Sequence, residues 1–178
     1  MQIMMIAAVD DQMGIARGGK IPWVMREDLR QFLQITRGDL QGKEQNAVIM
    51  GRKTWDSLPV KPLPGRSNLV LTSHPLSGVA QAASLSEAVS ICRQKNIPKV
   101  FLIGGQRVFN EGLSIAQKIL LSRIPGDFGC DTFFPPFEES GFIRIQRQWV
   151  ADAATMQPSG TETHGFWRET YVIQHSPK

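Results

Sequence analysis

Cysteine and histidine are scarce in this chain, which limits the chemistry that it can carry. Two cysteines, Cys92 and Cys130, and three scattered histidines occur among 178 residues. The cysteines form no CxxC pair, and neither has a second potential metal ligand at the usual spacing. The sequence therefore predicts no disulfide framework and no metal site, and we expect a reducing, cytoplasmic compartment.

Long apolar runs and blocks of like charge are missing as well. The apolar N-terminal segment, residues 1–9, is too short to span a bilayer, has no basic residues before it, and ends at Asp10 and Asp11. The net charge of +4 is spread along the chain, so it fits a small anionic ligand at least as well as nucleic acid. We expect neither a membrane segment nor a nucleic-acid partner.

The chain instead alternates strand and helix patterns over a length that suits one domain, residues 1–178. Apolar residues at helical spacing predict a helix near residues 25–36. The capping-box pattern Ser-Leu-Ser-Glu at residues 84–87 predicts the start of a second helix, in which Cys92 lies on the apolar face. Short apolar runs predict strands at residues 3–9, 47–50, 68–71, 100–103, 119–124, 143–150 and 169–173.

This alternation predicts an α/β domain with a largely parallel sheet. The polar segment 152–165 shows no helical pattern between the last two strands, which indicates an antiparallel hairpin at the end of the sheet. Sheets of this kind bind ligands beyond the carboxyl ends of their strands. The segments that follow the strands are therefore the candidate functional sites.

Asp28 lies on an apolar stripe of the first predicted helix, on the face that it shares with Met25, Phe32 and Ile35. Burial there would raise its pKa and suit it to proton donation or to a cationic ligand. Taken alone, a solvated first-turn acid stabilised by the helix dipole is the better interpretation. The preceding loop, residues 15–23, could form a lid, although by itself it fits an ordinary surface loop with Trp23 in the core better.

Two predicted strands run into glycines and then into helix starts that carry basic residues. Gly51 is followed by Arg52-Lys53-Thr54, and Gly104-Gly105 by Gln106-Arg107. Backbone N–H groups, the helix dipole and positive charge converge at such turns, which suits a phosphate. A solvated basic turn and a bare structural turn are the alternatives. Neither segment has the G-x-G-x-x-G pattern of a standard Rossmann fold.

In chain order, these segments resemble the bacterial type of dihydrofolate reductase along nearly the whole chain. The ordered set is far more specific than any one member, and it favours a functional interpretation of Asp28 and of the loop that ends at Trp23. The matching segments are Ile6-Ala7-Ala8, Ile21-Pro22-Trp23, Asp28-Leu29 with Phe32, Val48-Ile49-Met50-Gly51-Arg52 with Thr54-Trp55, Pro62-Leu63-Pro64-Gly65-Arg66, Ile103-Gly104-Gly105 and Asp131-Thr132. The resemblance implies an α/β single domain with a central, mostly parallel eight-stranded sheet, an antiparallel C-terminal hairpin and about four flanking helices.

The resemblance also implies a reaction, the reduction of 7,8-dihydrofolate to tetrahydrofolate in support of one-carbon metabolism. Hydride would pass from NADPH to C6, and a water near Ile21 and Trp23, rather than Asp28 itself, would carry the proton to N5. Asp28 would pair with the pterin 2-amino group and N3, with Ser122 supporting its carboxylate, and Arg66 would bind the glutamate α-carboxylate. The other implied substrate-site residues are Ile6, Ala8, Leu29, Phe32, Leu58, Leu63 and Ile103.

For NADPH, the resemblance implies phosphate contacts at the two glycine turns and a cis peptide bond at Gly104-Gly105. Arg52, Ser73 and His74 would recognise the 2′-phosphate, which favours NADPH over NADH. The implied cofactor-site residues are Ala8, Ile15, Gly51, Arg52, Lys53, Thr54, Leu71, Thr72, Ser73, His74, Ile103, Gly104, Gly105, Gln106, Arg107, Val108 and Phe109. The expected partners are dihydrofolate and antifolates, and we expect a monomer.

Three features depart from the family pattern. Ala16 stands where the family's lid usually has glycine, Phe109 stands where tyrosine is frequent, and the segment 37–46 is longer than in the shortest bacterial forms. Two alternatives remain, a pteridine or pyrimidine reductase of the same fold and a catalytically silent module that binds NADPH or folate. Phe32 and Arg66 argue against the first, and an intact Asp28 argues against the second.

Overall fold

The computed structural model describes residues 1–37, 46–152 and 164–174. Most of the segment 37–46, which is longer than in the shortest bacterial forms, and most of the connection 152–165 lie outside the described residues. Among the residues that the structure describes, no helix is both long and apolar enough to cross a bilayer.

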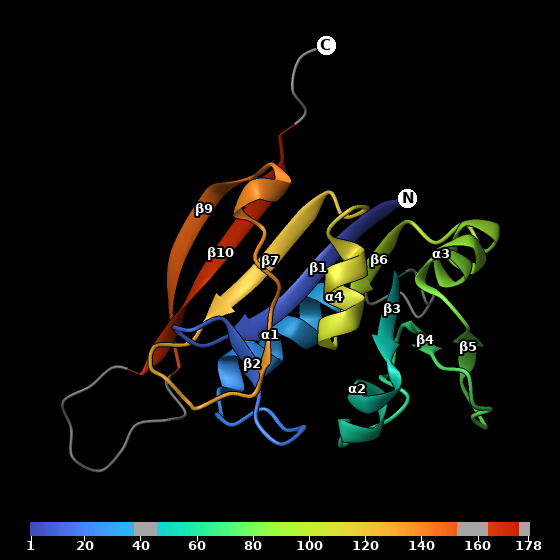
Figure 1. Ribbon diagram of the computed structural model, residues 1–178, viewed down its shortest axis with the longest axis horizontal. Helices are drawn as coiled ribbons and strands as arrows, with labels where there is room; N and C mark the ends of the chain where they lie inside the picture. Colours follow the sequence, from blue (N-terminus) through green and yellow to red (C-terminus); the bar gives the residue numbers. More distant parts are fainter. Residues whose placement is uncertain (38–45, 153–163, 175–178) are drawn as a thin grey trace.

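A sheet of eight strands forms the centre of the fold, in the order β5-β4-β3-β6-β1-β7-β10-β9 (Figure 1). The pairs from β5 through β7 are parallel, while β10 runs antiparallel to β7 and to β9. This confirms the expected parallel sheet with an antiparallel C-terminal hairpin. The strands are β1 (Gln2–Val9), β3 (Asn46–Gly51), β4 (Ser67–Leu71), β5 (Ala80–Ala82), β6 (Lys99–Leu102), β7 (Lys118–Arg123), β9 (Phe142–Ala151) and β10 (Gly165–Ile173).

Three short strands were not expected. One is β5, at the edge of the sheet; the others, β2 (Gly14–Ala16) and β8 (Thr132–Phe133), pair in a separate antiparallel ribbon. The expectation that the loop begins at residue 15 is therefore wrong, because residues 15 and 16 belong to β2. Strands of two or three residues contain too few positions for an alternating pattern. They form because the fold places a partner strand beside them.

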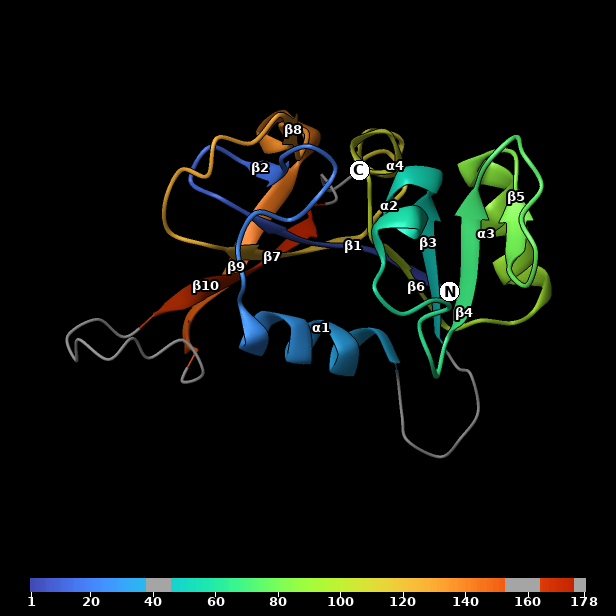
Figure 2. The ribbon, with the colours of Figure 1, turned by 90° about the horizontal axis from the view of Figure 1, so that it is seen from below.

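In the part of the chain that the structure describes, four α-helices cover the two faces of the sheet, with one short 3₁₀ turn, η1 (Glu138–Ser140). Phe32, Ile35 and Trp55 place the first two helices over one apolar cluster, and Val89 and Phe109 place the last two over the other. Figure 2 shows α1 along one face and the β2–β8 ribbon on the opposite side. The helices are α1 (Arg26–Arg37), α2 (Arg52–Ser57), α3 (Leu85–Gln94) and α4 (Gln106–Gly112).

The predicted start of α3 is confirmed, with one difference. Ser84 Oγ accepts a hydrogen bond of 3.2 Å from the Glu87 backbone N–H, but the Glu87 carboxylate accepts its bond of 2.7 Å from Ala83 rather than from Ser84. Cys92 is buried in the core as expected, and burial raises the pKa of its thiol to about 11. A neutral, enclosed thiol of this kind contributes to packing.

Candidate functional site

Three neighbouring strands contribute one residue each to a row that faces the first turn of α1. Ala8 of β1 is paired in register with Ser122 of β7, and Ser122 with Arg168 of β10. Asp28 of α1 meets this row: Ser122 Oγ donates a hydrogen bond to its Oδ1, and Arg168 Nη2 lies 3.2 Å from the same oxygen. The contact with Ser122 agrees with the expectation, whereas Arg168 was not expected here.

The Asp28 carboxyl is largely buried, with 18% of the side chain exposed. Burial raises the pKa of this carboxyl above its ordinary value, against the opposing effects of the Ser122 hydrogen bond and of the Arg168 charge. Both contacts use Oδ1. Among the described residues nothing donates a hydrogen bond to Oδ2, so this oxygen is available to a ligand.

An apolar cluster lies on the same face of the sheet and includes residues of β1, of α1 and of the connections that follow α2 and β6. It contains five of the expected substrate-site residues, Ile6, Phe32, Leu58, Leu63 and Ile103. Leu29, also expected at the substrate site, is 56% exposed. The cluster offers a flat ring an apolar wall beside one buried acid, which is the usual composition of a small-molecule site.

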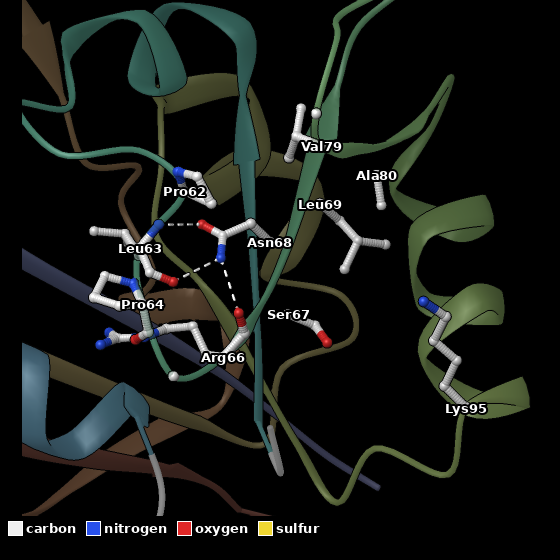
Figure 3. A pocket seen from close by; sticks show the side chains of 12 residues that line it. Pro62, Leu63, Pro64, Arg66, Ser67, Asn68, Leu69, Val79, Ala80 and Lys95 are labelled. Carbon is white, nitrogen blue, oxygen red and sulfur yellow. Dashed lines mark hydrogen bonds between the residues drawn. The ribbon is translucent and has the colours of Figure 1, made fainter. Parts of the chain in front are cut away.

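Arg66 lies in a turn whose shape is held by Asn68 (Figure 3). Asn68 Oδ1 accepts a hydrogen bond from the Leu63 backbone N–H, and Nδ2 donates to the carbonyl oxygens of Leu63 and Arg66, each at 2.9 Å. Arg66 is 2% exposed and donates to Thr36 Oγ1. Burial and the nearby charge of Arg37 lower its pKa. No described carboxylate pairs with it, so this pair of cations suits a ligand carboxylate.

The expected lid is attached to the connection between β7 and β8. The Gly18 backbone N–H donates a hydrogen bond of 2.7 Å to the Asp131 carboxylate. The ring of Trp23 packs edge-on against Phe128, with 5.2 Å between centroids. Ile21 is 64% exposed between these two attachments. The lid segment is thus attached at Gly18 and at Trp23, while Ile21, which is expected to close over the ligand, is exposed to solvent.

Asp10 organises the base of this segment. Its buried carboxylate accepts backbone hydrogen bonds from Gly14 at 2.7 Å, Gln12 at 2.9 Å and Phe128 at 3.2 Å. Burial raises the pKa of this carboxyl, but these bonds and one from the Cys130 thiol outweigh it and hold the pKa below its ordinary value. Asp10 therefore fixes β2 and the β7–β8 connection relative to β1.

The two glycine turns lie against each other. The Gly51 backbone N–H donates to the Gly104 carbonyl oxygen at 2.8 Å, and the Gly104-Gly105 peptide bond is cis, as the resemblance implies. A Cβ on Gly104 would lie 3.4 Å from the Phe109 ring, and one on Gly105 would lie 3.5 Å from Thr54 Oγ1. The absence of side chains therefore leaves space between the turns.

Helices α2 and α4 start at these turns without a side-chain cap, because glycine occupies both N-cap positions. The first backbone N–H groups are thus not used by an N-cap side chain. Arg52 and Arg107 form ion pairs within their own helices, each 2.8 Å long, with Asp56 and Glu111 respectively. All four side chains are well exposed, so such pairs hold the arginines only weakly.

The end of β4 lies beside Arg52, since Leu71 and Gly51 are paired in register. In the segment that follows, Thr72 Oγ1 accepts a hydrogen bond of 3.1 Å from the His74 backbone N–H, and Ser73 Oγ lies 3.2 Å from His74 Nδ1. Ser73 and His74 are therefore in contact with each other, and Arg52 directly follows the residue that is paired with Leu71. Of the other expected cofactor-site residues, Lys53 and Gln106 are exposed, Ile15 packs against the larger core, and Val108 is buried.

Sequence reasoning missed three of the residues that shape the site, Arg168, Asp10 and Arg37. A signal existed for Arg168. In β10 it alternates with Phe166 and Thr170, both buried, so an arginine stands on an inward face. Asp10 bonds to the nearby Gln12 and Gly14 but also to the distant Phe128, and Arg37 lies near Arg66 only in the folded protein, so the sequence does not show what either residue joins.

Comparison with known proteins gives one consistent result. A family model described as dihydrofolate reductase matches residues 2–162. Dihydrofolate reductases of Heliothis virescens and Neisseria meningitidis are 34% and 32% identical to the chain, over 82% and 83% of it and 85% and 87% of their own lengths. A bifunctional dihydrofolate reductase-thymidylate synthase of Glycine max is 38% identical over 82% of the chain, which spans only 29% of that protein.

Proposed function

Since this chain belongs to the dihydrofolate reductase family, we propose that it reduces 7,8-dihydrofolate to 5,6,7,8-tetrahydrofolate with NADPH, as a monomer in the cytoplasm. The observation that carries this proposal is the buried Asp28 carboxylate, which keeps Oδ2 available at the border of an apolar cluster. An ionised carboxylate there matches the 2-amino group and the adjacent ring N–H of a pterin, which are two donors in one plane.

The rest of the substrate fits the same face of the molecule. Phe32, Leu58 and Leu63 offer apolar contacts to the ring and to the benzoyl group. Arg66, buried and without a carboxylate partner among the described residues, suits the α-carboxylate of the glutamate tail. This feature favours dihydrofolate over a substrate without a glutamate tail, such as that of another reductase with the same fold.

The residues at the two glycine turns fit NADPH. The glycines at 51, 104 and 105 place no side chain at the two helix starts, which suits the close approach of a pyrophosphate, and Arg52 with Ser73 and His74 suits the 2′-phosphate. When bound, NADPH supplies the hydride that reduces the C6–N5 double bond.

The protein's own contribution is alignment and control of water. Asp28 orients the pterin and, as an anion, raises the basicity of N5 through the ring. It is bound to the far edge of the pterin, so it is badly placed to donate a proton to N5. We assign the passage of that proton to a water held near Trp23, with Ile21 limiting the entry of others.

The experiment is a spectrophotometric assay of NADPH oxidation with dihydrofolate, run on the parent protein, on Asp28→Asn and on Glu139→Gln. Glu139 is exposed in η1, which follows Phe137 of the larger apolar cluster on the other face of the sheet, so its variant controls for the loss of a carboxylate. We expect kcat/KM at pH 7 to fall by about 100-fold or more in Asp28→Asn, to recover in part at low pH, where the substrate itself is protonated, and to stay unchanged in Glu139→Gln. An inactive parent, or an Asp28→Asn variant with the parent rate, overturns the proposal.

The preference for NADPH is tested separately with Arg52→Gln, and with Arg93→Gln on the exposed surface of α3 as its control. We expect KM for NADPH to rise about tenfold in the first variant, because one charge-assisted contact to the 2′-phosphate is lost, and KM for NADH to change little. Equal effects on the two cofactors would contradict this role of Arg52.

A further inference from the structure

Arg168 places a buried positive charge against the carboxylate that the proposed function uses to hold the pterin, so the inference below rests on that function. Its side chain is 12% exposed, and its Nη2 lies 3.2 Å from Asp28 Oδ1 and 3.1 Å from Gln31 Oε1. Strand β10 presents it from the sheet, while Asp28 comes from α1, 140 residues earlier in the chain. The pair therefore forms only in the folded protein.

The hydrogen bonding of Arg168 is incomplete. Nε and Nη1 are buried and have no hydrogen-bond partner among the described residues. The guanidinium carbon lies 5.4 Å from the centre of the Phe166 ring, which provides a weak cation–π contact. A buried guanidinium with two unpaired nitrogens is unfavourable on its own. Its charge is therefore balanced mainly by Asp28.

Among the described residues, the other two charges with a marked effect on Asp28 are acidic. Glu27 precedes it on α1, and Asp152 follows β9. Glu27 is itself paired with Arg30 at 2.7 Å, and Asp152 accepts a hydrogen bond from the Glu27 backbone N–H at 3.3 Å. Among the described residues, Arg168 is thus the cation in direct contact with Asp28. When Asp28 is ionised, the opposite charges of the two side chains cancel, so together they form a nearly neutral unit.

A nearly neutral unit distinguishes between ligands by their charge. A 2-amino-4-oxo ring binds the free carboxylate oxygen as a neutral donor, so the Arg168 charge affects it little. A 2,4-diamino ring, which is more basic, binds an anionic carboxylate as its cation. That cation is attracted by Asp28 but repelled by Arg168 on the other side of the same carboxylate, across a poorly solvated site.

We propose that Arg168 is a specificity-determining residue, which makes the Asp28 site favour neutral 2-amino-4-oxo rings over diamino rings that bind as cations. Arg168 acts through Asp28 and through its charge, and it needs no contact with the ligand. Its role is distinct from the support that Ser122 gives to the same oxygen, since a hydroxyl adds a hydrogen bond without a charge.

The test compares two probes that differ in one substituent, 2-amino-4-oxo-6,7-dimethylpteridine and 2,4-diamino-6,7-dimethylpteridine. Their dissociation constants are measured by calorimetry from pH 5 to 8, in buffers that also report the protons taken up on binding. The proteins are the parent, Arg168→Met, Arg168→Gln and Arg168→Lys. Arg144→Met, which removes a partly exposed arginine of β9 that contacts Glu169 rather than Asp28, controls for net charge.

We expect the preference for the diamino probe to rise on the order of tenfold at pH 7 in Arg168→Met and Arg168→Gln, with the bound diamino probe in its protonated form. Arg168→Lys and Arg144→Met should keep the parent ratio. Arg168→Gln can still donate to Asp28, so it carries the test if the methionine variant does not fold.

If the parent enzyme is active but the ratio of the two dissociation constants is unchanged in Arg168→Met and Arg168→Gln, the inference is overturned while the proposed function stands. A parent that binds neither probe and reduces no dihydrofolate overturns the proposed function and the inference together. A ratio that rises equally in Arg168→Lys also counts against the inference, because it shows that the shape of the arginine, and not its charge, is what matters.

Discussion

Gly18 and Asp131 lie 113 residues apart in the sequence and are joined by a hydrogen bond of 2.7 Å from the Gly18 backbone N–H to the Asp131 carboxylate. The Asp131 backbone N–H in turn donates to the Ala16 carbonyl oxygen at 2.9 Å. This two-way connection fastens the lid segment to the residues before β8. The bond from Gly18 also holds the pKa of the Asp131 carboxyl below its ordinary value.

Replacing Asp131 by alanine should loosen the lid. We expect the Gly18 amide to exchange its hydrogen several-fold faster, because its acceptor is lost, and we expect kcat to fall if the lid controls water at the pterin. Hydrogen exchange followed by NMR gives the first result, and the dihydrofolate assay gives the second. Glu139→Ala, an exposed substitution outside the lid and its attachments, should change neither quantity, and unchanged exchange at Gly18 in Asp131→Ala would show that this bond does not hold the segment.

Asp10→Asn should destabilise the protein by about 2 kcal/mol at pH 7, since an amide oxygen accepts less well than a buried carboxylate with several donors. The pKa of Asp10 is lower in the folded protein than its ordinary value of 3.8. The ionised form therefore contributes stability above about pH 4, and this contribution is lost as the pH falls through the folded pKa.

Urea unfolding of the parent and of Asp10→Asn at pH 7, 4 and 3 tests whether the contribution of Asp10 to the unfolding free energy falls as the pH is lowered. The difference in unfolding free energy should be largest at pH 7 and should shrink below pH 4. Asp11→Asn serves as the control, because Asp11 is exposed and accepts one backbone bond, from Gly126. A difference in unfolding free energy that grows toward low pH would contradict a lowered pKa of Asp10 in the folded protein.

Arg66→Lys should weaken the binding of the glutamate tail of the substrate without affecting the binding of the pterin ring. We expect KM for dihydrofolate to rise about tenfold, because lysine lacks the planar two-donor fork that suits a carboxylate. KM for 6,7-dimethyl-7,8-dihydropterin, which has no glutamate, should be unchanged. Since Arg66 also donates to Thr36, the melting temperature of the variant is measured alongside, and an equal rise in KM for both substrates would point to a general disturbance of the site.

Gly112→Ala should weaken the packing of α4 against the sheet. A Cβ at this position would lie 2.4 Å from Leu102 Cδ1 and 3.6 Å from Met5 Sδ, an overlap that costs about 1–3 kcal/mol in a packed core. The double variant with Leu102→Val removes part of the overlap, so its loss of unfolding free energy should be smaller than the sum of the two single losses. Additive losses would mean that the two side chains do not meet. Because α4 follows Gly104-Gly105, we also expect the affinity for NADPH to fall in Gly112→Ala.

Much of the fold could be predicted from the sequence because its signals are local. The long strands β1, β3 and β9 and the helix α1 carry an apolar pattern over enough residues to define their type. The start of α3 at Ser84 is set by a hydroxyl within hydrogen-bonding reach of its own helix. The short strands β2, β5 and β8 could not be predicted, since each depends on a partner strand that is distant in the chain.

The candidate site also contains residues that could be predicted from the sequence and residues that could not. Asp28, Phe32 and Arg66 were identified from segments whose order resembles a known family, and the structure places them on one side of the sheet with Ser122 and Leu63. Arg37 beside Arg66 was not foreseen, although both residues are basic and visible in the sequence. Only folding shows that two cations lie close together without a described carboxylate partner.

By itself, the sequence determined the α/β class, the long elements, the glycine turns before α2 and α4, and Asp28 as the acid to examine. The tertiary structure alone decided the surroundings of that acid. It set Arg168 and Ser122 against one oxygen of the carboxylate and left the other oxygen open. The physical reason is that secondary structure follows from neighbours in the chain, whereas the electrostatic setting of a buried charge follows from residues that the fold brings together.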